Sequence, residues 1–242
     1  MSERAAGILM PISSLPSEYG IGCFSKSAYE FVDWLKKAGQ SYWQILPLGP
    51  TSYGDSPYQS FSSFAGNPYF IDLEQLVEQQ LLTKEECDSF DFGKNPESID
   101  YAKLYQNRYK ILRMACDRFL KQPSDAFFAF CQENDWWLGN YALFMVIKNM
   151  HKGASWLQWE EKYKRRDFAA LDQVWHGQHD EIQFYQFQQY MFFCQWKKLH
   201  AYAEQADIQI IGDIPIYVAL DSADAWAEPQ LFQFDEELKP AA

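Results

Sequence analysis

The sequence lacks long apolar runs and paired cysteines. No apolar run approaches the ~18 to 20 residues that a membrane-spanning helix needs. The start, MSERAAGILMPISS, has no long apolar stretch of the kind that a secretory signal peptide carries. The five cysteines are scattered without a C-x-x-C pair, which is typical of reduced buried thiols and not of a disulfide framework or zinc site. We therefore expect a soluble cytoplasmic protein with no membrane partner.

Positive charge is also scarce. The 242 residues include 33 Asp and Glu against 21 Lys and Arg, a formal net charge of −12. Such a field repels phosphate backbones, so nucleic acid is not expected as a partner.

Motifs for common cofactors and nucleophiles are missing. The chain has no G-x-S-x-G, no phosphate-binding Gly-rich loop and no H-E-x-x-H. His176 and His179 in HGQHD leave a metal site open as an alternative, because their spacing suits one helix face. Gly177 interrupts that face and no third ligand is obvious, which favours a solvated loop without metal.

Aromatic residues, by contrast, are abundant at 18% of the chain. A Trp-rich helical core accounts for most of them. Aromatic residues beyond the needs of the core favour flat ligands with polar edges, such as sugars. The run GPTSYGDSPYQSFSSFAGNPYFID, residues 49–72, follows neither a helical nor a strand period. A long irregular segment in a compact domain is usually either functional or disordered. Its five aromatic residues are costly to leave in water, so we expect an ordered loop.

Three segments have the apolar, Gly- and Pro-bounded pattern of buried parallel strands: AAGILMPISSLPS, Tyr42–Leu48 and DIQIIGDIPIYVAL. The helix SAYEFVDWLKKAG separates the first two, with Ser27 and Glu30 in the positions of a capping box and Gly39 as its stop. Its apolar stripe is predicted at Phe31, Trp34, Leu35 and Ala38. A strand, a helix and a strand in this order predict a parallel sheet with right-handed crossovers.

Helical periodicity fills most of the chain between the second and third strands. Three segments carry it: YAKLYQNRYKILRMACDRFLKQ, WWLGNYALFMVIKNM and FYQFQQYMFFCQWKKLHAYAEQA. We therefore divide the chain into residues 1–75, with the first strands and the irregular loop, residues 76–180, a helical insertion, and residues 181–242, with a return helix and the third strand. The fold class is α/β.

Two places could carry chemistry. Asp213 follows the third strand, where α/β active sites are built, although an aspartate there can also cap a turn. In the irregular loop, Tyr53, Asp55, Ser56 and Tyr58 combine flat ring faces with groups that fix hydroxyls. The alternative is that Gly54 and Pro57 shape a tight turn there and the tyrosines seal the sheet end.

Four stretches of the chain resemble glycoside hydrolase family 77, the 4-α-glucanotransferases or amylomaltases. They are SSLPSEYGIG, YWQILPLGPTSYGDSPYQSFSSFAGNPYFIDL, WWLGNYALFMVIK and FFCQWKKLHAYAEQADIQIIGDIPIYVALDSADAWAEPQLFQFDEE. The resemblance implies the N-terminal part of a (β/α)8 TIM barrel with about three strands and a helical insertion. It also implies cofactor-free transfer of α-1,4-glucan segments to the 4-hydroxyl of another glucan, with maltooligosaccharides as substrates.

The resemblance also assigns roles to single residues. Tyr58 would stack on the sugar beside the cleaved bond, Ser56 would contact glucan, and Tyr53 would touch a more distant part of it. Asp213 would bind and orient the sugar at the cut. Asp55 and Asn67 would hold the loop, with a sugar contact as a further option.

The family's catalytic carboxylates follow later barrel strands, and no carboxylate of this chain matches their motifs. We therefore assign no catalytic residue and expect residues 1–242 to be inactive alone. Two alternatives stay open, a non-catalytic maltodextrin-binding protein and a hydrolase of the related amylase group. The oligomeric state is not set by the sequence.

Overall fold

The computed structural model describes residues 4–51, 55–95 and 97–241. Contacts divide the chain into two compact units, each built from three separate segments. Unit 1 comprises Met1–Leu48, Gly66–Pro123 and Met191–Ile214, and unit 2 comprises Gly49–Ala65, Ser124–Tyr190 and Pro215–Ala242. The three-part division expected from the sequence stays a prediction.

Unit 1 contains a parallel sheet of three short strands, β1 (Gly7–Leu9), β2 (Tyr42–Gln44) and β3 (Gln209–Ile211), in the order β1-β2-β3. The register places Ile8, Trp43 and Ile210 in one row across the sheet, and Trp43 is fully buried. Leu9 and Ile211 lie in the next row, and their side chains are 53% and 44% exposed. Burial on both faces was therefore the wrong expectation for these strands, because only one of the two alternating rows is covered.

The first helix, α1 (Lys26–Lys37), starts earlier than the expected capping box. Its N-cap is Ser25, without a side-chain cap hydrogen bond, so the capping box at Ser27 is wrong. The expected stripe is also corrected. Leu35 is buried as expected, but Trp34 is 55% exposed and Ala38 is exposed, and the helix buries Ala28 and Val32 in their place. Gly39 ends the helix at φ +68°, a conformation that favours glycine, as expected.

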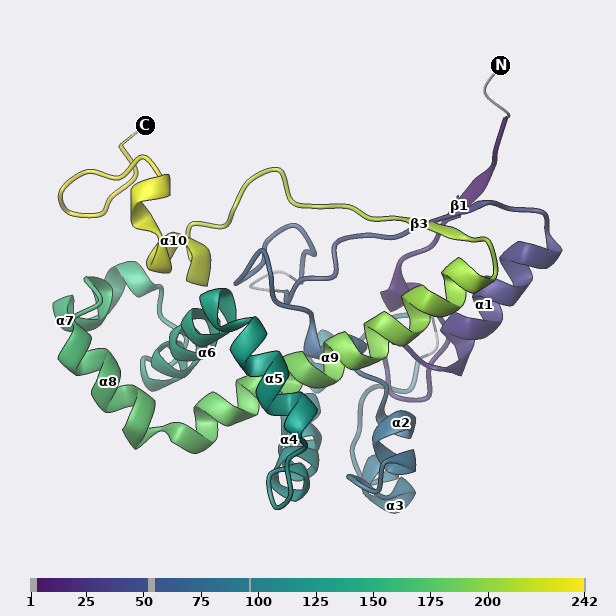
Figure 1. The fold of residues 1–242 in the computed structure, drawn as a ribbon, viewed down its shortest axis with the longest axis horizontal. Coiled ribbons are helices and arrows are strands. Elements are labelled where there is room, and N and C mark those ends of the chain that lie inside the picture. The colour runs from purple at the N-terminus through teal and green to yellow at the C-terminus, as the bar shows by residue number, and fades with distance from the viewer. Residues whose placement is uncertain (1–3, 52–54, 96, 242) are drawn as a thin grey trace. The chain divides into compact units, whose positions relative to one another are not determined.

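The other helices of unit 1 are α2 (Leu73–Glu78), α3 (Lys84–Asp88), α4 (Tyr101–Phe119) and the C-terminal part of α9 (His179–Gln205). The helix expected at α4 is confirmed, and it buries Leu104, Ile111, Leu112 and Ala115 fully. Helix α9 runs beside α1, where Tyr202 donates a hydrogen bond to Asp33 at 2.8 Å, and it then leads into β3 (Figure 1).

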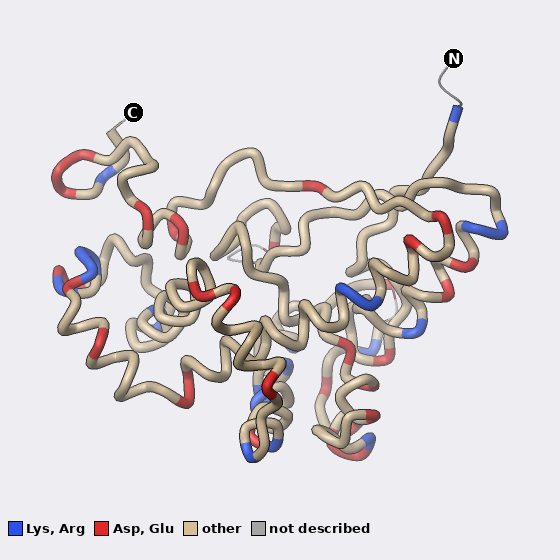
Figure 2. Tube along the Cα trace, viewed as in Figure 1, with Lys and Arg blue, Asp and Glu red and all other residues tan. Residues whose placement is uncertain are grey.

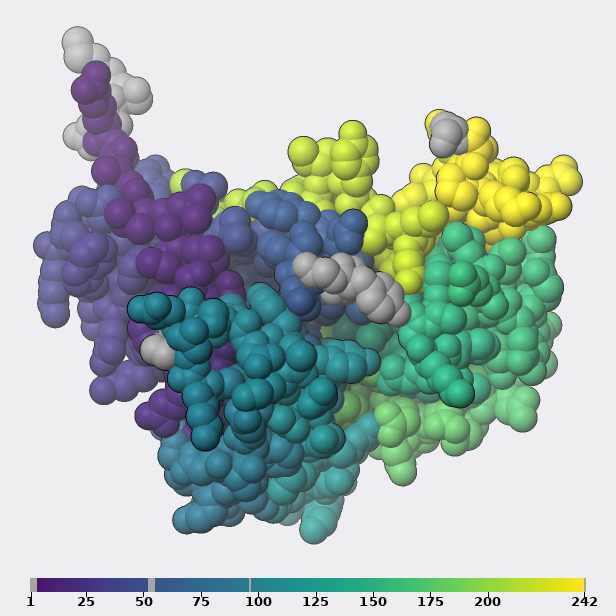
Figure 3. Space-filling model, turned by 180° about the vertical axis from the view of Figure 1, so that it is seen from behind, coloured from purple at the N-terminus to yellow at the C-terminus, as the bar shows by residue number. Residues whose placement is uncertain are grey.

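Unit 2 is helical. It contains α5 (Asp125–Glu133), α6 (Asp135–Met150), α7 (Glu161–Lys164), α8 (Phe168–Gly177), α10 (Ala223–Ala227) and the start of α9. Helix α6 is its centre, with a continuous buried run from Tyr141 to Lys148. Burial on all sides explains why the sequence of this helix is apolar nearly all round. In the space-filling view of Figure 3, the C-terminal segment, in yellow, lies against the green helical segments of the same unit.

His176 lies in α8 and His179 begins α9, so the loop expected around them is wrong. The short 3-10 helices are η1 (Ile12–Ser14), η2 (Pro68–Phe70), η3 (Trp156–Gln158) and η4 (Pro229–Leu231). Among the residues that the structure describes, no helix is long and apolar enough to cross a membrane. The stretch from β3 to Leu220 carries only Asp213 as a charged residue (Figure 2).

Candidate functional site

In unit 2, the irregular loop is held by its own small hydroxyl groups. Ser60 Oγ donates to the carbonyl of Ser62 at 2.7 Å, and Ser62 Oγ accepts from the amides of Phe64 and Ala65 at 3.1 and 3.2 Å. Ser60 and Ser62 are both buried. Side chains thus replace the backbone hydrogen bonds that a helix or strand would supply. The serines therefore explain why this segment is ordered although its sequence follows no helical or strand period.

Ser56 shapes the turn that presents Tyr58. Its Oγ accepts from the Tyr58 amide at 3.3 Å and its carbonyl accepts from Gln59 at 3.2 Å. The preceding residue, Asp55, has φ +57°, in the left-handed region that aspartate tolerates better than most residues. Tyr58 is 45% exposed, so much of its ring is open to a ligand.

Tyr58 lines a cavity of about 430 Å³ that lies wholly within unit 2. The segment from Tyr217 to Asp221 also lines this cavity, and Tyr217 is 85% exposed. Two tyrosines and a carboxylate at one cavity provide flat apolar faces with hydroxyl and carboxylate partners. This is the chemistry that a sugar ring needs, with C–H groups on its faces and hydroxyls on its edge.

Helix α6 holds the segment that contains Tyr217 in place through Lys148. Lys148 Nζ donates to Asp221 Oδ2 at 2.6 Å and to the Ala154 carbonyl at 3.3 Å. Trp156 donates its amide to Asp221 Oδ1 at 3.3 Å and its indole N–H to the Leu220 carbonyl at 2.7 Å. A buried ammonium and a buried indole therefore fix the position of this cavity wall.

The segment is tied directly to the irregular loop as well. The Ala223 amide donates to the Phe61 carbonyl at 2.8 Å, and the Ser63 amide donates to Asp224 Oδ2 at 2.9 Å. The two segments that line the cavity are thus linked by hydrogen bonds within one unit.

The remaining predicted residues are placed separately. Asp213 lies in unit 1, two residues beyond the end of β3, and is partly exposed. Asn67 is 2% exposed and caps η2, its Oδ1 accepting from the Tyr69 amide at 3.0 Å. Tyr53 lies outside the described residues. The structure therefore brings Ser56 and Tyr58 together in one turn, whereas the roles expected for Asn67, Asp55 and Asp213 stay predictions.

The sequence reasoning missed Tyr217 and Asp221, which line the cavity, and Lys148, which binds Asp221. A signal existed for Lys148, which is the one charge in the buried run of α6. A lysine in such a run requires an acidic partner, because an unpaired buried charge is strongly unfavourable. Tyr217 carried no such signal, since it belongs to an apolar run expected to be covered.

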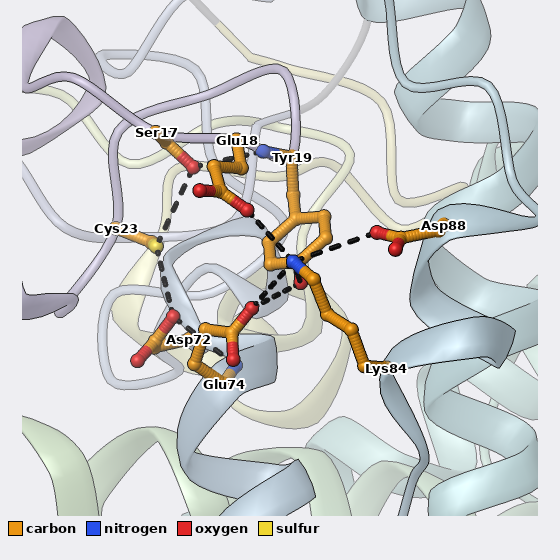
Figure 4. Close-up of polar contacts among 8 residues, drawn as sticks. All are labelled: Ser17, Glu18, Tyr19, Cys23, Asp72, Glu74, Lys84 and Asp88. Atoms are coloured by element: carbon orange, nitrogen blue, oxygen red, sulfur yellow. Dashed lines mark hydrogen bonds and ion pairs between the residues drawn. The ribbon is translucent and has the colours of Figure 1, made fainter.

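A second polar cluster lies in unit 1, centred on Lys84 (Figure 4). Its Nζ contacts Glu18 at 2.7 Å, Glu74 at 2.9 Å and Asp88 at 3.5 Å, and it donates to the Tyr19 hydroxyl at 2.8 Å. Hydrogen bonds to Glu18, Tyr19 and Glu74 raise the pKa of Lys84, and the bond from Tyr19 is the main cause that lowers the pKa of Glu74.

Below this cluster, Cys23 donates to Asp72 Oδ1 at 3.7 Å, and burial raises the pKa of its thiol to about 12. A cavity of about 830 Å³ adjoins the cluster and is lined by residues of the 16–19, 25–29 and 72–78 segments. Every charged group at its centre already has an opposite partner. We therefore interpret the cluster as a clamp between three segments of unit 1 and not as a reaction site.

Comparison with known proteins places these observations in a family. A sequence model described as glycoside hydrolase family 77, 4-alpha-glucanotransferase, matches residues 10–239. The 4-alpha-glucanotransferase of Clostridium butyricum is 48% identical over 94% of this chain and 47% of its own length. That of Thermus thermophilus is 45% identical over 98% of this chain and 47% of its own length.

Solved structures agree with the sequence relatives. Amylomaltase from Streptococcus agalactiae in complex with acarbose superposes with a TM-score of 0.95 at 41% identity, covering 98% of this chain and 48% of that one. The barrel-strand and helical-insertion fold expected from the sequence is confirmed by this match. The chain spans about half the length of the relatives it matches. It belongs to glycoside hydrolase family 77, the 4-α-glucanotransferases.

Proposed function

We propose that this chain forms part of the sugar-binding cleft of a 4-α-glucanotransferase. In this proposal the whole protein transfers segments of an α-1,4-glucan to the 4-hydroxyl of an acceptor glucan. The observation that carries the proposal is the cavity at Tyr58, which Tyr217 and Asp221 also line. The relatives named as 4-alpha-glucanotransferases, and the amylomaltase that holds acarbose, support an α-glucan as the ligand.

In this proposal Tyr58 stacks on the sugar ring next to the bond that is cut. Its 45% exposure leaves the ring accessible, and the turn at Ser56 fixes the backbone from which it projects. Ser56 and Tyr53 contact other parts of the glucan. Asp213 binds and orients the sugar at the cut, while Asp55 and Asn67 hold the loop.

The chemistry itself requires two carboxyl groups. In a retaining glycosidase-type reaction, one attacks the anomeric carbon as the leaving oxygen takes a proton from the other, and a glycosyl-enzyme intermediate forms. The second group then deprotonates the incoming 4-hydroxyl, which displaces the first. Because the family's motifs for both groups are absent here, we propose that residues 1–242 bind glucan without catalysing transfer.

The test is disproportionation of maltotriose by the whole protein and by residues 1–242. We expect the whole protein to release glucose and form longer maltooligosaccharides, and residues 1–242 to do neither. In the whole protein, Tyr58→Ala should lower kcat/KM by about tenfold or more, whereas Tyr58→Phe keeps the ring and most of the activity.

Other outcomes distinguish the alternatives. Reducing sugar without longer products would indicate a hydrolase. Glucan binding without any product from the whole protein would indicate a maltodextrin-binding protein and overturn the proposed transfer. Transfer by residues 1–242 alone would overturn the assignment of the catalytic groups to other segments. The expected cytoplasmic location stays a prediction.

A further inference from the structure

Unit 2 contains another cavity, separate from the one at Tyr58, with a volume of about 330 Å³. Its aromatic lining includes Phe64, Trp136 and Trp137, and its polar lining includes Asn140, Asp224 and Glu228. The volume falls within the range of small-molecule sites, and so does the composition, a mostly apolar lining with a few polar groups.

The aromatic lining is exposed yet fixed in orientation. Trp136 is 63% exposed and Phe64 is 47% exposed. The two rings meet edge to face with centroids 4.6 Å apart, and Phe64 also lies 6.4 Å from Trp137. The indole N–H of Trp137 donates to Asn134 Oδ1 at 3.1 Å. Large rings that stay exposed while held by neighbours are costly in water unless a ligand covers them.

The polar groups offer both a donor and acceptors. Arg166 Nη2 donates to Asn140 Oδ1 at 2.7 Å, and Arg166 itself stacks 4.2 Å from the Trp226 ring centroid. This bond fixes the amide so that its oxygen is engaged and its Nδ2 is the remaining donor; no hydrogen bond from Nδ2 is seen among the described residues. Asp224 Oδ2 accepts from the Ser63 amide at 2.9 Å, which orients that carboxylate.

These features select one class of ligand. A cation would use the carboxylates alone and would lie near the guanidinium of Arg166, which is one hydrogen bond from the cavity. An anion would meet two carboxylates. A neutral ring with adjacent hydroxyls uses the Asn140 donor and the carboxylate acceptors together, and its C–H face covers the indole.

We propose that this cavity is a second glucan-binding site, at which a pyranose ring stacks on Trp136 and its hydroxyls bind Asn140, Asp224 and Glu228. The choice of a glucan among neutral polyols rests on the proposed function. The site holds a part of a long chain away from Tyr58, so it contributes to binding of long glucans and not to turnover of short ones.

The experiment is native electrophoresis of the whole protein through gels containing soluble amylose, with maltotriose transfer measured in parallel. The variants are Trp136→Ala and Asn140→Ala, made in the natural sequence and in a Tyr58→Ala background. Trp34→Ala is the matched control, because Trp34 is a similarly exposed tryptophan (55%) in unit 1. Circular dichroism confirms that each variant is folded.

We expect Trp136→Ala and Asn140→Ala to weaken retention by amylose roughly tenfold, most clearly in the Tyr58→Ala background. Maltotriose kinetics and the Trp34→Ala variant should be unchanged. Retention by Trp136→Ala equal to that of Trp34→Ala would overturn the second site and leave the proposed function intact. Loss of retention in Trp136→Ala without transfer by any form would support the site and overturn the proposed function. Neither retention nor transfer in the natural sequence would overturn both.

Discussion

Lys148 Nζ lies 2.6 Å from Asp221 Oδ2 although only 4% of the lysine side chain is exposed. The ammonium also lies 5.0 Å from the Phe61 ring centroid and 5.6 Å from that of Phe144. The pair thus connects the buried C-terminal part of helix α6 to Asp221 in the lining of the Tyr58 cavity.

The two partners of this pair should differ in their effect on stability. Asp221→Asn leaves a buried ammonium without its counter-ion, and we expect it to lower the free energy of unfolding by about 3–5 kcal/mol. Lys148→Met leaves Asp221, whose side chain is 27% exposed and reaches water, so the cost should be about 1–3 kcal/mol.

Urea unfolding followed by circular dichroism measures both values. The control is Lys103→Met, which breaks an exposed pair with Asp91 at 2.7 Å and should change nothing measurable. An effect of Asp221→Asn as small as that of Lys103→Met would show that the buried pair does not hold this wall.

Glu86 should make the stability of unit 1 depend on pH. Its hydrogen bond from Arg118 lowers the pKa of the carboxyl from 4.5 to about 2. Because the folded-state pKa lies below the unfolded one, the stabilisation is fully present above about pH 4.5 and is lost as the pH falls towards 2. We expect Glu86→Gln to be less stable than the natural protein at pH 7, with the difference shrinking on acidification and vanishing near pH 2.

The measurement is the urea midpoint of both forms from pH 7 to pH 2. Glu97→Gln removes an exposed carboxylate that forms no ion pair among the described residues, and its curve should run parallel to that of the natural protein. A difference between Glu86→Gln and the natural protein that persists unchanged at low pH would contradict the role of the Arg118 bond.

Gly66 is required by close packing in unit 1. A Cβ built at this residue would lie 2.2 Å from two ring carbons of Phe192, a buried side chain of α9. We expect Gly66→Ala to lower the free energy of unfolding by roughly 1–3 kcal/mol. Gly177→Ala is the matched substitution, since a Cβ there meets nothing within 4 Å. Differential scanning calorimetry of the two variants tests this, and a Gly66→Ala that unfolds no earlier than Gly177→Ala would refute the packing argument.

Cys23 should react more slowly than the partly exposed thiols of the folded chain. It is fully buried, and burial raises its pKa to about 12, so at pH 8 only about one molecule in ten thousand carries the reactive thiolate. Mass spectrometry after brief treatment with iodoacetamide should find Cys131 and Cys194, which are partly exposed, modified before Cys23. After unfolding in urea, the three cysteines should be modified at similar rates. Early modification of Cys23 in the folded protein would contradict its enclosure.

Capping shows where local sequence signals suffice and where they fail. Ser27 with Glu30, and Thr83 with Glu86, have the same spacing, yet only Thr83 forms a capping box, with both reciprocal hydrogen bonds. Helix α1 begins at Lys26, which leaves Ser27 inside its first turn. Trp34 was likewise assigned to the core by its apolar character, and it is exposed because the helix instead buries the face of Ala28, Val32 and Leu35.

The sequence by itself determined the order of the three strands and of helices α1, α4, α6 and α9, the stop at Gly39 and the family. These features depend on spacing over a few residues or on long motifs, and both can be read directly from the sequence. Only the tertiary structure decided that Tyr58 and Tyr217, about 160 residues later, line one cavity, and that Lys148 pairs with Asp221. Such contacts follow from how α6 and α10 pack within unit 2, and local periodicity carries no information on which distant segments meet.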